Sequence, residues 1–265
     1  MYRGFNLKIK DELNKSEYFT TGKKLFTDYL GEIQNRIVDI IAHDGIINGN
    51  KVIEDWFPQI ECDIFLSHSH DDQGTAFELA GYLKQNFGLT TFIDSTVWGF
   101  SNTLLKTLDD EYCLNDGGNT YNYNLRNYST SHVHLMLKSA LDKMIDSCEA
   151  VFFLNTPNSV SARNTVKENT KSPWIFSEIA TTQIIRKKTP NRLKQETRLF
   201  SAKESVSMNE NSRNRLSVEY ELELNHFTTL DIYDLQHWKN RHYNKGENAL
   251  DELYRLKPID SRFLI

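Results

Sequence analysis

Three short polar segments follow apolar runs in this chain of 265 residues, and each holds side chains that could bind a ligand. The segments are Ser67-His68-Ser69-His70-Asp71-Asp72, Asp94-Ser95 and Asn155-Thr156. In open parallel sheets, ligands bind beyond the carboxyl ends of the strands. If the three apolar runs are strands of one such sheet, these segments converge on a single crevice.

A carboxylate and an aromatic ring lie close together further along the chain. Trp174 and Glu178 are four residues apart behind Ser172-Pro173, a typical helix start, so their side chains share one helix face. An aromatic plane beside a carboxylate suits a nucleotide, because the ring can stack and the acid can meet positive charge. The ordinary alternatives are a solvated glutamate near the positive end of a helix and simple packing of the tryptophan.

Alternating strands and helices are predicted around these segments. Strands are expected where short apolar runs end in polar residues, at 64–66, 89–94 and 150–155. Helices are expected over 76–87, ended by Gly88, over 133–145 behind the capping candidates Ser129 to Ser131, and from Pro173 onward. This order predicts the α/β class, a flavodoxin-like parallel sheet flanked by helices.

The remaining segments complete the expected organisation. Residues 1–59 are expected to form an N-terminal helical extension, with a four-residue apolar repeat from Leu25 to Ile41. The main domain then covers 60–265, with a long polar insertion over about 95–128 expected to be a loop. A polar stretch over 189–214 precedes an alternating strand at 218–224 and terminal helices near 235–238 and 249–254.

Composition narrows the class of protein. The formal net charge of −5 and the short basic runs give no reason to expect nucleic-acid binding. The sequence has no apolar stretch long enough for a membrane span and no apparent targeting signal at its start. Three widely spaced cysteines indicate neither a disulfide framework nor a metal knuckle. We therefore expect a cytoplasmic protein that does not bind membranes.

Taken in order, these motifs resemble the Toll/interleukin-1 receptor (TIR) domain over roughly residues 60 to 185. The resemblance is carried by DIFLSHSHDD, by TFIDSTVWG and by the helix that contains Trp174-Ile175-Phe176-Ser177-Glu178. The segment Asp94-Ser95-Thr96-Val97-Trp98 is also similar to the corresponding part of the TIR proteins of Thoeris anti-phage systems. The resemblance implies an NAD⁺ nucleosidase in which Glu178 is catalytic and the segment after the second strand covers the substrate.

Further expectations follow from the same resemblance. NAD⁺ would be the substrate, with no separate cofactor and no metal, and the residues shaping its site would be Ser67, His68, His70, Asp94, Trp98 and Trp174. The product would be a hydrolysed or cyclised ADP-ribose, acting on a separate effector protein as a second messenger in antiviral defence. A homo-oligomer is expected, because TIR enzymes commonly build their sites between protomers. Simple depletion of NAD⁺ is the alternative output.

Two other functions compete with this one. Many TIR domains are interaction scaffolds without known catalysis, and this chain could be one of them. The segment His68-Ser69-His70-Asp71-Asp72 also resembles the HxHxDH motif of metallo-β-lactamase-fold hydrolases, with His132 and His134 as further zinc ligands. Gln73 stands where that motif requires its last histidine, and parallel alternation does not suit that fold.

Overall fold

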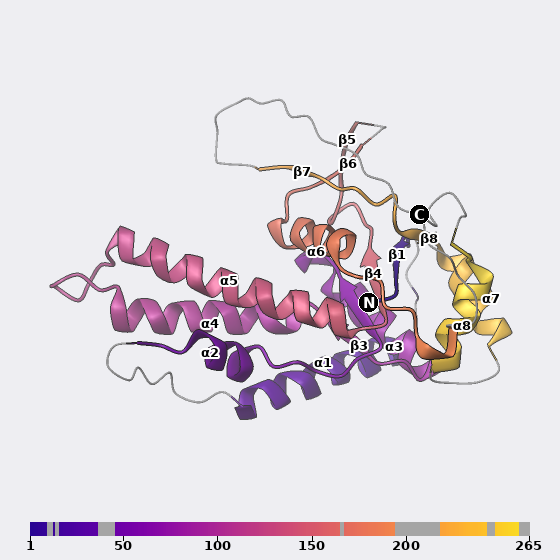
Figure 1. The fold of residues 1–265 in the computed structure, drawn as a ribbon, viewed down its shortest axis with the longest axis horizontal. Coiled ribbons are helices and arrows are strands. Elements are labelled where there is room, and N and C mark those ends of the chain that lie inside the picture. The colour runs from indigo at the N-terminus through magenta and orange to yellow at the C-terminus, as the bar shows by residue number, and fades with distance from the viewer. Residues whose placement is uncertain are drawn as a thin grey trace.

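The computed structural model describes residues 1–9, 13, 16–36, 46–164, 167–193, 218–242 and 247–259. Its centre is a five-stranded parallel sheet in the order β3-β2-β4-β1-β8 (Figure 1). The strands are β1 (Arg3–Leu7), β2 (Ile64–Ser67), β3 (Thr91–Ile93), β4 (Ala150–Leu154) and β8 (Thr228–Leu230). The prediction of a flavodoxin-like α/β fold is confirmed, and so are the strands expected at 64–66, 89–94 and 150–155.

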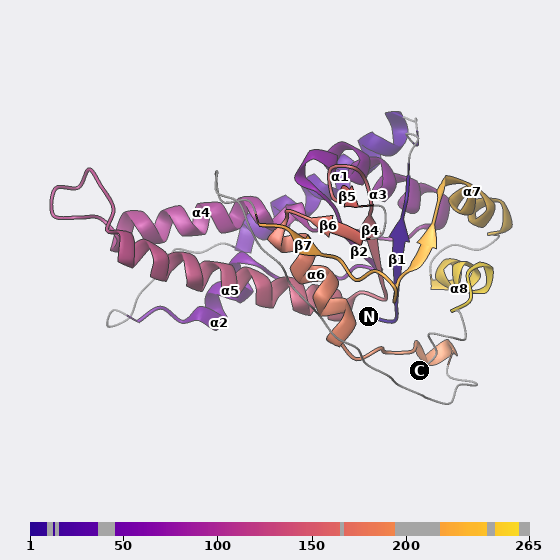
Figure 2. The ribbon, with the colours of Figure 1, turned by 90° about the horizontal axis from the view of Figure 1, so that it is seen from above.

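Helices cover both faces of this sheet (Figure 2). One face carries α1 (Ser16–Arg36) and α3 (Gln73–Phe87), with α7 (Ile232–Arg241) and α8 (Glu247–Leu256) near the β8 edge. The other face carries α2 (Gly49–Trp56), α5 (Tyr123–Ser147) and α6 (Pro173–Ile184). Successive strand residues serve opposite faces, so Phe65 packs with the second group of helices and Leu66 with the first.

The first strand corrects the expected domain boundary. Strand β1 lies inside the sheet between β4 and β8, with Phe5 opposite both Phe152 and Thr228. The helical prediction before residue 60 holds for α1 and α2, but residues 3–7 belong to the central sheet and not to an extension. Gly4 and Asn6 interrupt the apolar pattern there; a Cβ at Gly4 would come within 2.3 Å of the Phe227 ring.

A helical arm replaces the loop that was expected at 95–128. Helix α4 (Ser95–Tyr112) starts directly after β3, and α5 runs back beside it, so the two extend away from the sheet (Figure 1). The loop prediction and the caps at Ser129 to Ser131 are therefore wrong; the N-cap of α5 is Asn122. Only the turn at Asp116-Gly117-Gly118 is real, with Gly118 at φ 71°. The arm forms because apolar residues of the two helices pack together: Leu104, Leu108, Val133 and Leu137.

Smaller elements complete the fold. A short antiparallel sheet contains β5 (Ser161–Asn164), β6 (Lys167–Thr170) and β7 (Tyr220–Glu221). The strand expected at 218–224 pairs only over β7, although Leu222 and Leu224 are buried and Glu221 and Glu223 exposed, as the alternation predicts. Two 3₁₀ turns lie at His70–Asp72 and Asn191–Leu193. Ile37 and Ile41 and most of the stretch at 189–214 lie outside the described residues.

Two predicted helix ends agree with the structure. Gly88 ends α3 in the left-handed conformation at φ 76°, and its N–H donates to the carbonyl of Lys84. Ser172 caps α6, where its hydroxyl accepts a hydrogen bond from the Ile175 N–H and Pro173 fills the first turn. Among the described helices, none is long and apolar enough to cross a bilayer.

Candidate functional site

The polar ends of β2, β3 and β4 meet, as the sequence predicts. The buried carboxylate of Asp72, after β2, accepts hydrogen bonds from Thr156 and from Asn158, after β4. Gln73 donates to the Ser95 hydroxyl after β3 at 3.3 Å. The chain passes from β2 to β3 on one side and later reaches β4 on the other. This is the point at which such sheets bind ligands.

Helix α6 brings Glu178 to this point. Its buried residues are Ile175, Glu178, Ile179, Thr181 and Thr182, so Glu178 is the only ionisable side chain on the buried face of this helix. Only 2% of the Glu178 side chain is exposed. The alternative of a solvated surface glutamate is therefore wrong. A carboxyl group buried in this way needs a partner, a proton or a ligand.

Two side chains from neighbouring strand ends face Glu178. They are the hydroxyl of Ser67 and the carboxyl of Asp94, both within interaction distance and both fully buried. Burial and the like charge of Asp94 raise the pKa of Glu178 well above its ordinary value of 4.5. The Ser67 hydroxyl and the charge of Lys138, on α5, act in the opposite direction more weakly.

His68 and Trp98 support Asp94 from the other side. Nδ1 of His68 lies 2.5 Å from Oδ1 of Asp94, and the His68 backbone N–H donates to Oδ2 at 3.3 Å. The Trp98 ring stacks on the His68 ring, with centroids 5.6 Å apart and planes 14° from parallel. His68 is fully buried, so the imidazole is fixed between a carboxylate and an indole.

Several polar atoms around Glu178 have no well-formed hydrogen bond. They are Ser67 Oγ, both ring nitrogens of His68, Asp94 Oδ1, Trp98 Nε1, Ser177 Oγ and both carboxyl oxygens of Glu178. Glu178 is close to Ser67 and Asp94. The contact with the Ser67 hydroxyl does not have hydrogen-bond alignment, and two carboxyl groups can bond to each other only if one of them carries a proton. More than 90% of buried polar groups in proteins have a partner, so such a concentration indicates a functional site.

The other predicted site residues lie further out. His70 is exposed, and its ring centroid lies 6.2 Å from that of Trp98. Trp174 is half-buried and packs edge-on against His134 of α5 at 5.5 Å. A covering loop after β3 was expected, but α4 begins there, and Trp98 on its first turn stands in the place of that loop.

Sequence reasoning missed two residues of this region. Lys138 lies one position beyond Leu137 of the apolar stripe of α5, and this position next to a predicted buried face was the available signal. Ser177 precedes Glu178 and has a buried hydroxyl without a partner. No local pattern distinguishes that serine from any other helical serine.

The alternative zinc set does not come together. His68 contacts Asp94, Asp72 is bonded to Thr156 and Asn158, and His132 and His134 are exposed on α5. Across the part of the chain that the structure describes, no group of three or more His, Cys, Asp or Glu side chains has the arrangement of a metal site.

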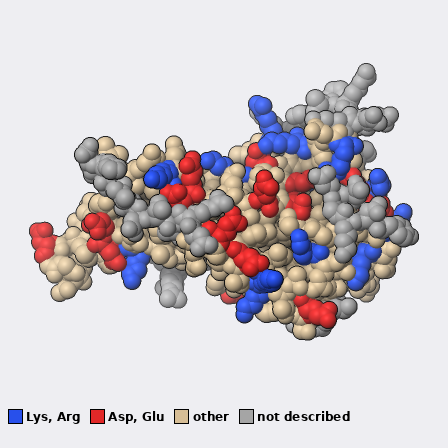
Figure 3. All heavy atoms as spheres, turned by 90° about the horizontal axis from the view of Figure 1, so that it is seen from below, with Lys and Arg blue, Asp and Glu red and all other residues tan. Residues whose placement is uncertain are grey.

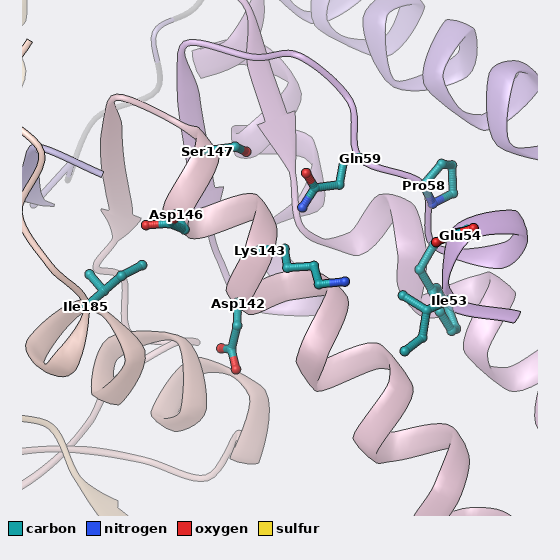
Figure 4. Close-up of a pocket in the computed structure, with 10 residues that line it drawn as sticks. Ile53, Glu54, Pro58, Gln59, Asp142, Lys143, Asp146, Ser147 and Ile185 are labelled. Carbon is teal, nitrogen blue, oxygen red and sulfur yellow. The ribbon is translucent and has the colours of Figure 1, made fainter. Parts of the chain in front are cut away.

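A cleft of about 740 Å³ lies elsewhere, between α2, the last turns of α5 and Ile185 (Figure 4). Its lining residues Pro58 and Gln59 precede β2, and Ser147 precedes β4, so the cleft is at the amino end of the sheet. Its acidic residues have partners: Asp142 binds Lys138 and Thr181, and Asp146 binds Lys188. The cleft is thus separate from the carboxyl end of the sheet, where Glu178 lies.

Surface charge singles out no macromolecular ligand on the face seen from below. Lys and Arg side chains are interspersed there with Asp and Glu side chains (Figure 3). Comparisons with protein-family models, curated proteins and solved structures found no match for this chain. Any function must therefore be argued from the residues around Glu178.

Proposed function

We propose that the carboxyl end of the central sheet binds NAD⁺ and cleaves its nicotinamide–ribose bond, with Glu178 as the catalytic carboxylate. One observation carries the proposal: a carboxyl group that is 2% exposed and lacks a well-formed hydrogen bond lies where parallel sheets bind ligands. A cationic group placed beside it would ionise Glu178 and supply the missing partner. We infer from the resemblance to TIR enzymes that NAD⁺ supplies this cationic group.

The chemistry needs little more than this carboxylate. Nicotinamide leaves the ribose as a neutral molecule, so no acid has to protonate it, and the ribose carbon gains positive charge as the bond breaks. A carboxylate fixed beside that carbon stabilises the charge, as in glycoside cleavage. Attack by water gives ADP-ribose, nicotinamide and one proton. Attack by a hydroxyl or ring nitrogen of the same molecule gives a cyclic product instead.

Neighbouring residues support this role. The stacked rings of His68 and Trp98 form an aromatic wall beside Asp94, and such a wall excludes water from a reacting centre. Ser67 brings a hydroxyl to the carboxyl group of Glu178. We propose two outer contacts for the substrate, the exposed His70 and Trp174 beside His134.

The wider role is part of the same proposal. The product would act on a separate effector protein as a messenger of anti-phage defence, and a homo-oligomer would present the sites. The helical arm is suited to contacts between proteins, because Tyr123, Tyr128 and Leu135 expose large apolar side chains on α5. The same feature favours a scaffold as the second candidate function.

The test is mass spectrometry of NAD⁺ incubated with the wild type and with Glu178→Gln at low and high protein concentration, with and without a chelator. We expect nicotinamide from the wild type, unaffected by the chelator, and a loss of about 100-fold or more in the variant. The second product separates hydrolysis from cyclisation. Equal rates for the two proteins, or intact NAD⁺ with folded wild type at every concentration, would contradict the proposal and favour the scaffold.

A further inference from the structure

Glu178 and Asp94 form a pair of buried carboxyl groups that differ in their surroundings. Both are almost fully buried, and they are close enough to interact directly. Two carboxylates at this distance and depth cannot both be ionised, because each would pay for burial and for the repulsion of the other. Burial and the like charge of Asp94 raise the pKa of Glu178 well above 4.5, so the pair retains one proton.

The hydrogen-bond donors decide which carboxyl group carries this proton. Asp94 has the His68 ring at 2.5 Å on one oxygen and the His68 backbone N–H at 3.3 Å on the other. One nitrogen thus lies against each Asp94 oxygen, although the ring contact does not have hydrogen-bond alignment. Glu178 has only the poorly aligned Ser67 hydroxyl and the more distant charge of Lys138. The asymmetry leaves the proton on Glu178.

The support of Asp94 is itself fixed. The His68 ring cannot rotate freely, because it stacks against Trp98 of α4 and has no exposed surface. Asp94 also lies at the junction of β3 and α4, where its backbone N–H donates to Leu66 of β2. The pair His68–Asp94 is therefore a rigid unit, placed before any ligand arrives.

We propose that Asp94 is a positioning residue that, with His68, keeps the shared proton on Glu178 until a cationic substrate group displaces it. The proton leaves to solvent as the cation enters, so Glu178 becomes a carboxylate only beside a positive charge. This inference rests on the proposed function for the identity of the cation. The protonated carboxyl pair itself does not depend on which substrate binds. The described charged and titratable groups around Glu178 are Asp94, Lys138 and, behind Asp94, His68.

The first experiment observes the proton without any substrate. Difference infrared spectroscopy over a pH titration detects the carbonyl stretch of a protonated carboxyl group in the wild type, Glu178→Gln and Asp94→Asn. We expect this band in the wild type at neutral pH and its loss in Glu178→Gln. In Asp94→Asn it should disappear at least one pH unit lower than in the wild type. A wild type without the band at neutral pH would overturn the inference, whatever NAD⁺ does.

The second experiment uses the pH dependence of NAD⁺ cleavage. Wild-type activity should rise with pH as the pair loses its proton, and Asp94→Asn should move the midpoint of this rise at least one pH unit lower. The control is Asp72→Asn, which should leave the midpoint in place. Asp72 is a buried aspartate at the same sheet edge, but it is bonded to Thr156 and Asn158. A merely structural role for Asp94 would lower the rate at every pH and leave the midpoint in place, which would refute the inference.

The two experiments separate the two possible failures. A protonated carboxyl band with the expected variant behaviour, but no NAD⁺ cleavage, supports the carboxyl pair and rejects the proposed function. Cleavage that requires Glu178, without the band and without a midpoint shift in Asp94→Asn, supports the function and rejects the role of Asp94.

Discussion

At the carboxyl end of the central sheet, Ser67, Asp94 and Glu178 are buried among polar atoms that lack well-formed hydrogen bonds. At the amino end, Asp142 and Asp146 line an open cleft of about 740 Å³, and each is bonded to a lysine. The presence of a cleft alone would favour the amino end as the binding site. The hydrogen bonding of the polar groups favours the carboxyl end instead. Buried polar groups without partners destabilise a fold, so they are found mainly at positions that serve a function.

The largest expected effect is a difference in activity between matched variants at the two ends. Each replaces a carboxylate by its amide: Glu178→Gln at the carboxyl end and Asp142→Asn at the amino end. We expect NAD⁺ cleavage to fall about 100-fold or more in the first. In the second it should stay within about twofold, because Asp142 is half-exposed and any ion pair it makes is weak. Nicotinamide release measures both rates, and an equal loss in both variants would remove the contrast.

The second prediction concerns stability against pH. Below the ordinary value of 4.5, Glu178 is protonated in the folded and unfolded states alike. As the pH rises further, the unfolded state ionises while the folded state keeps its proton, so the free energy of unfolding falls until the raised folded pKa is passed. Within this window the cost is about 1.4 kcal/mol per pH unit.

Glu178→Gln removes this cost, so the variant should gain stability over the wild type as the pH rises from about 5 toward neutrality. Denaturant unfolding at several pH values measures the difference, and Asp142→Asn is the control from the amino end. A variant curve parallel to that of the wild type over this range would mean that Glu178 ionises normally.

The sequence predicted the carboxyl end well for local reasons. Strands β2 and β4 are continuous apolar runs ended by polar residues, and Ser172-Pro173 starts α6, so the place of Glu178 followed from short-range patterns. The meeting of Glu178 with Asp94 required only the general rule for parallel sheets. The burial of Glu178 was not predicted, although its position between Ile175 and Ile179 places it on the same helix face as these buried residues.

One error arose where partners are distant in sequence. Strand β1 looks weak alone, since Gly4 and Asn6 break its apolar pattern, yet its Arg3 pairs with Ala150 of β4, far along the chain. All of α4 was mistaken for part of a polar loop, although its buried Val97, Phe100, Leu104 and Leu108 recur every three or four residues. The polar residues after Tyr112 were extended to the whole segment, and the apolar period within it was overlooked.

Lys138 interacts with groups at both ends of the sheet, so replacing it tests the difference between them. Its ammonium group binds Asp142 at 2.6 Å and Thr181 at 3.0 Å, while its charge lowers the pKa of Glu178. In Lys138→Met, Glu178 should hold its proton more tightly, so activity at neutral pH should fall about threefold to tenfold and recover as the pH is raised. Stability should change by about 1 kcal/mol at most, because the ion pair is half-exposed.

The matched control for Lys138→Met is Lys143→Met, which removes a cation from the same helix but from the lining of the cleft. We expect its activity and pH profile to equal those of the wild type. A loss in Lys138→Met that is constant over pH would show that Lys138 acts through packing and not through its charge.

The smallest expected effect comes from the cap of the helix that carries Glu178. Ser172→Ala removes the hydroxyl that accepts from the Ile175 N–H at 3.3 Å, which should cost about 1 kcal/mol in thermal unfolding. Ser172→Asp keeps an accepting oxygen and should restore that stability. Activity should stay within about twofold in both, because the burial of Ile175 and Ile179 fixes the helix independently of its cap. If Ser172→Ala instead loses activity while it remains folded, activity depends on the first turn of α6 as well as on the groups around Glu178.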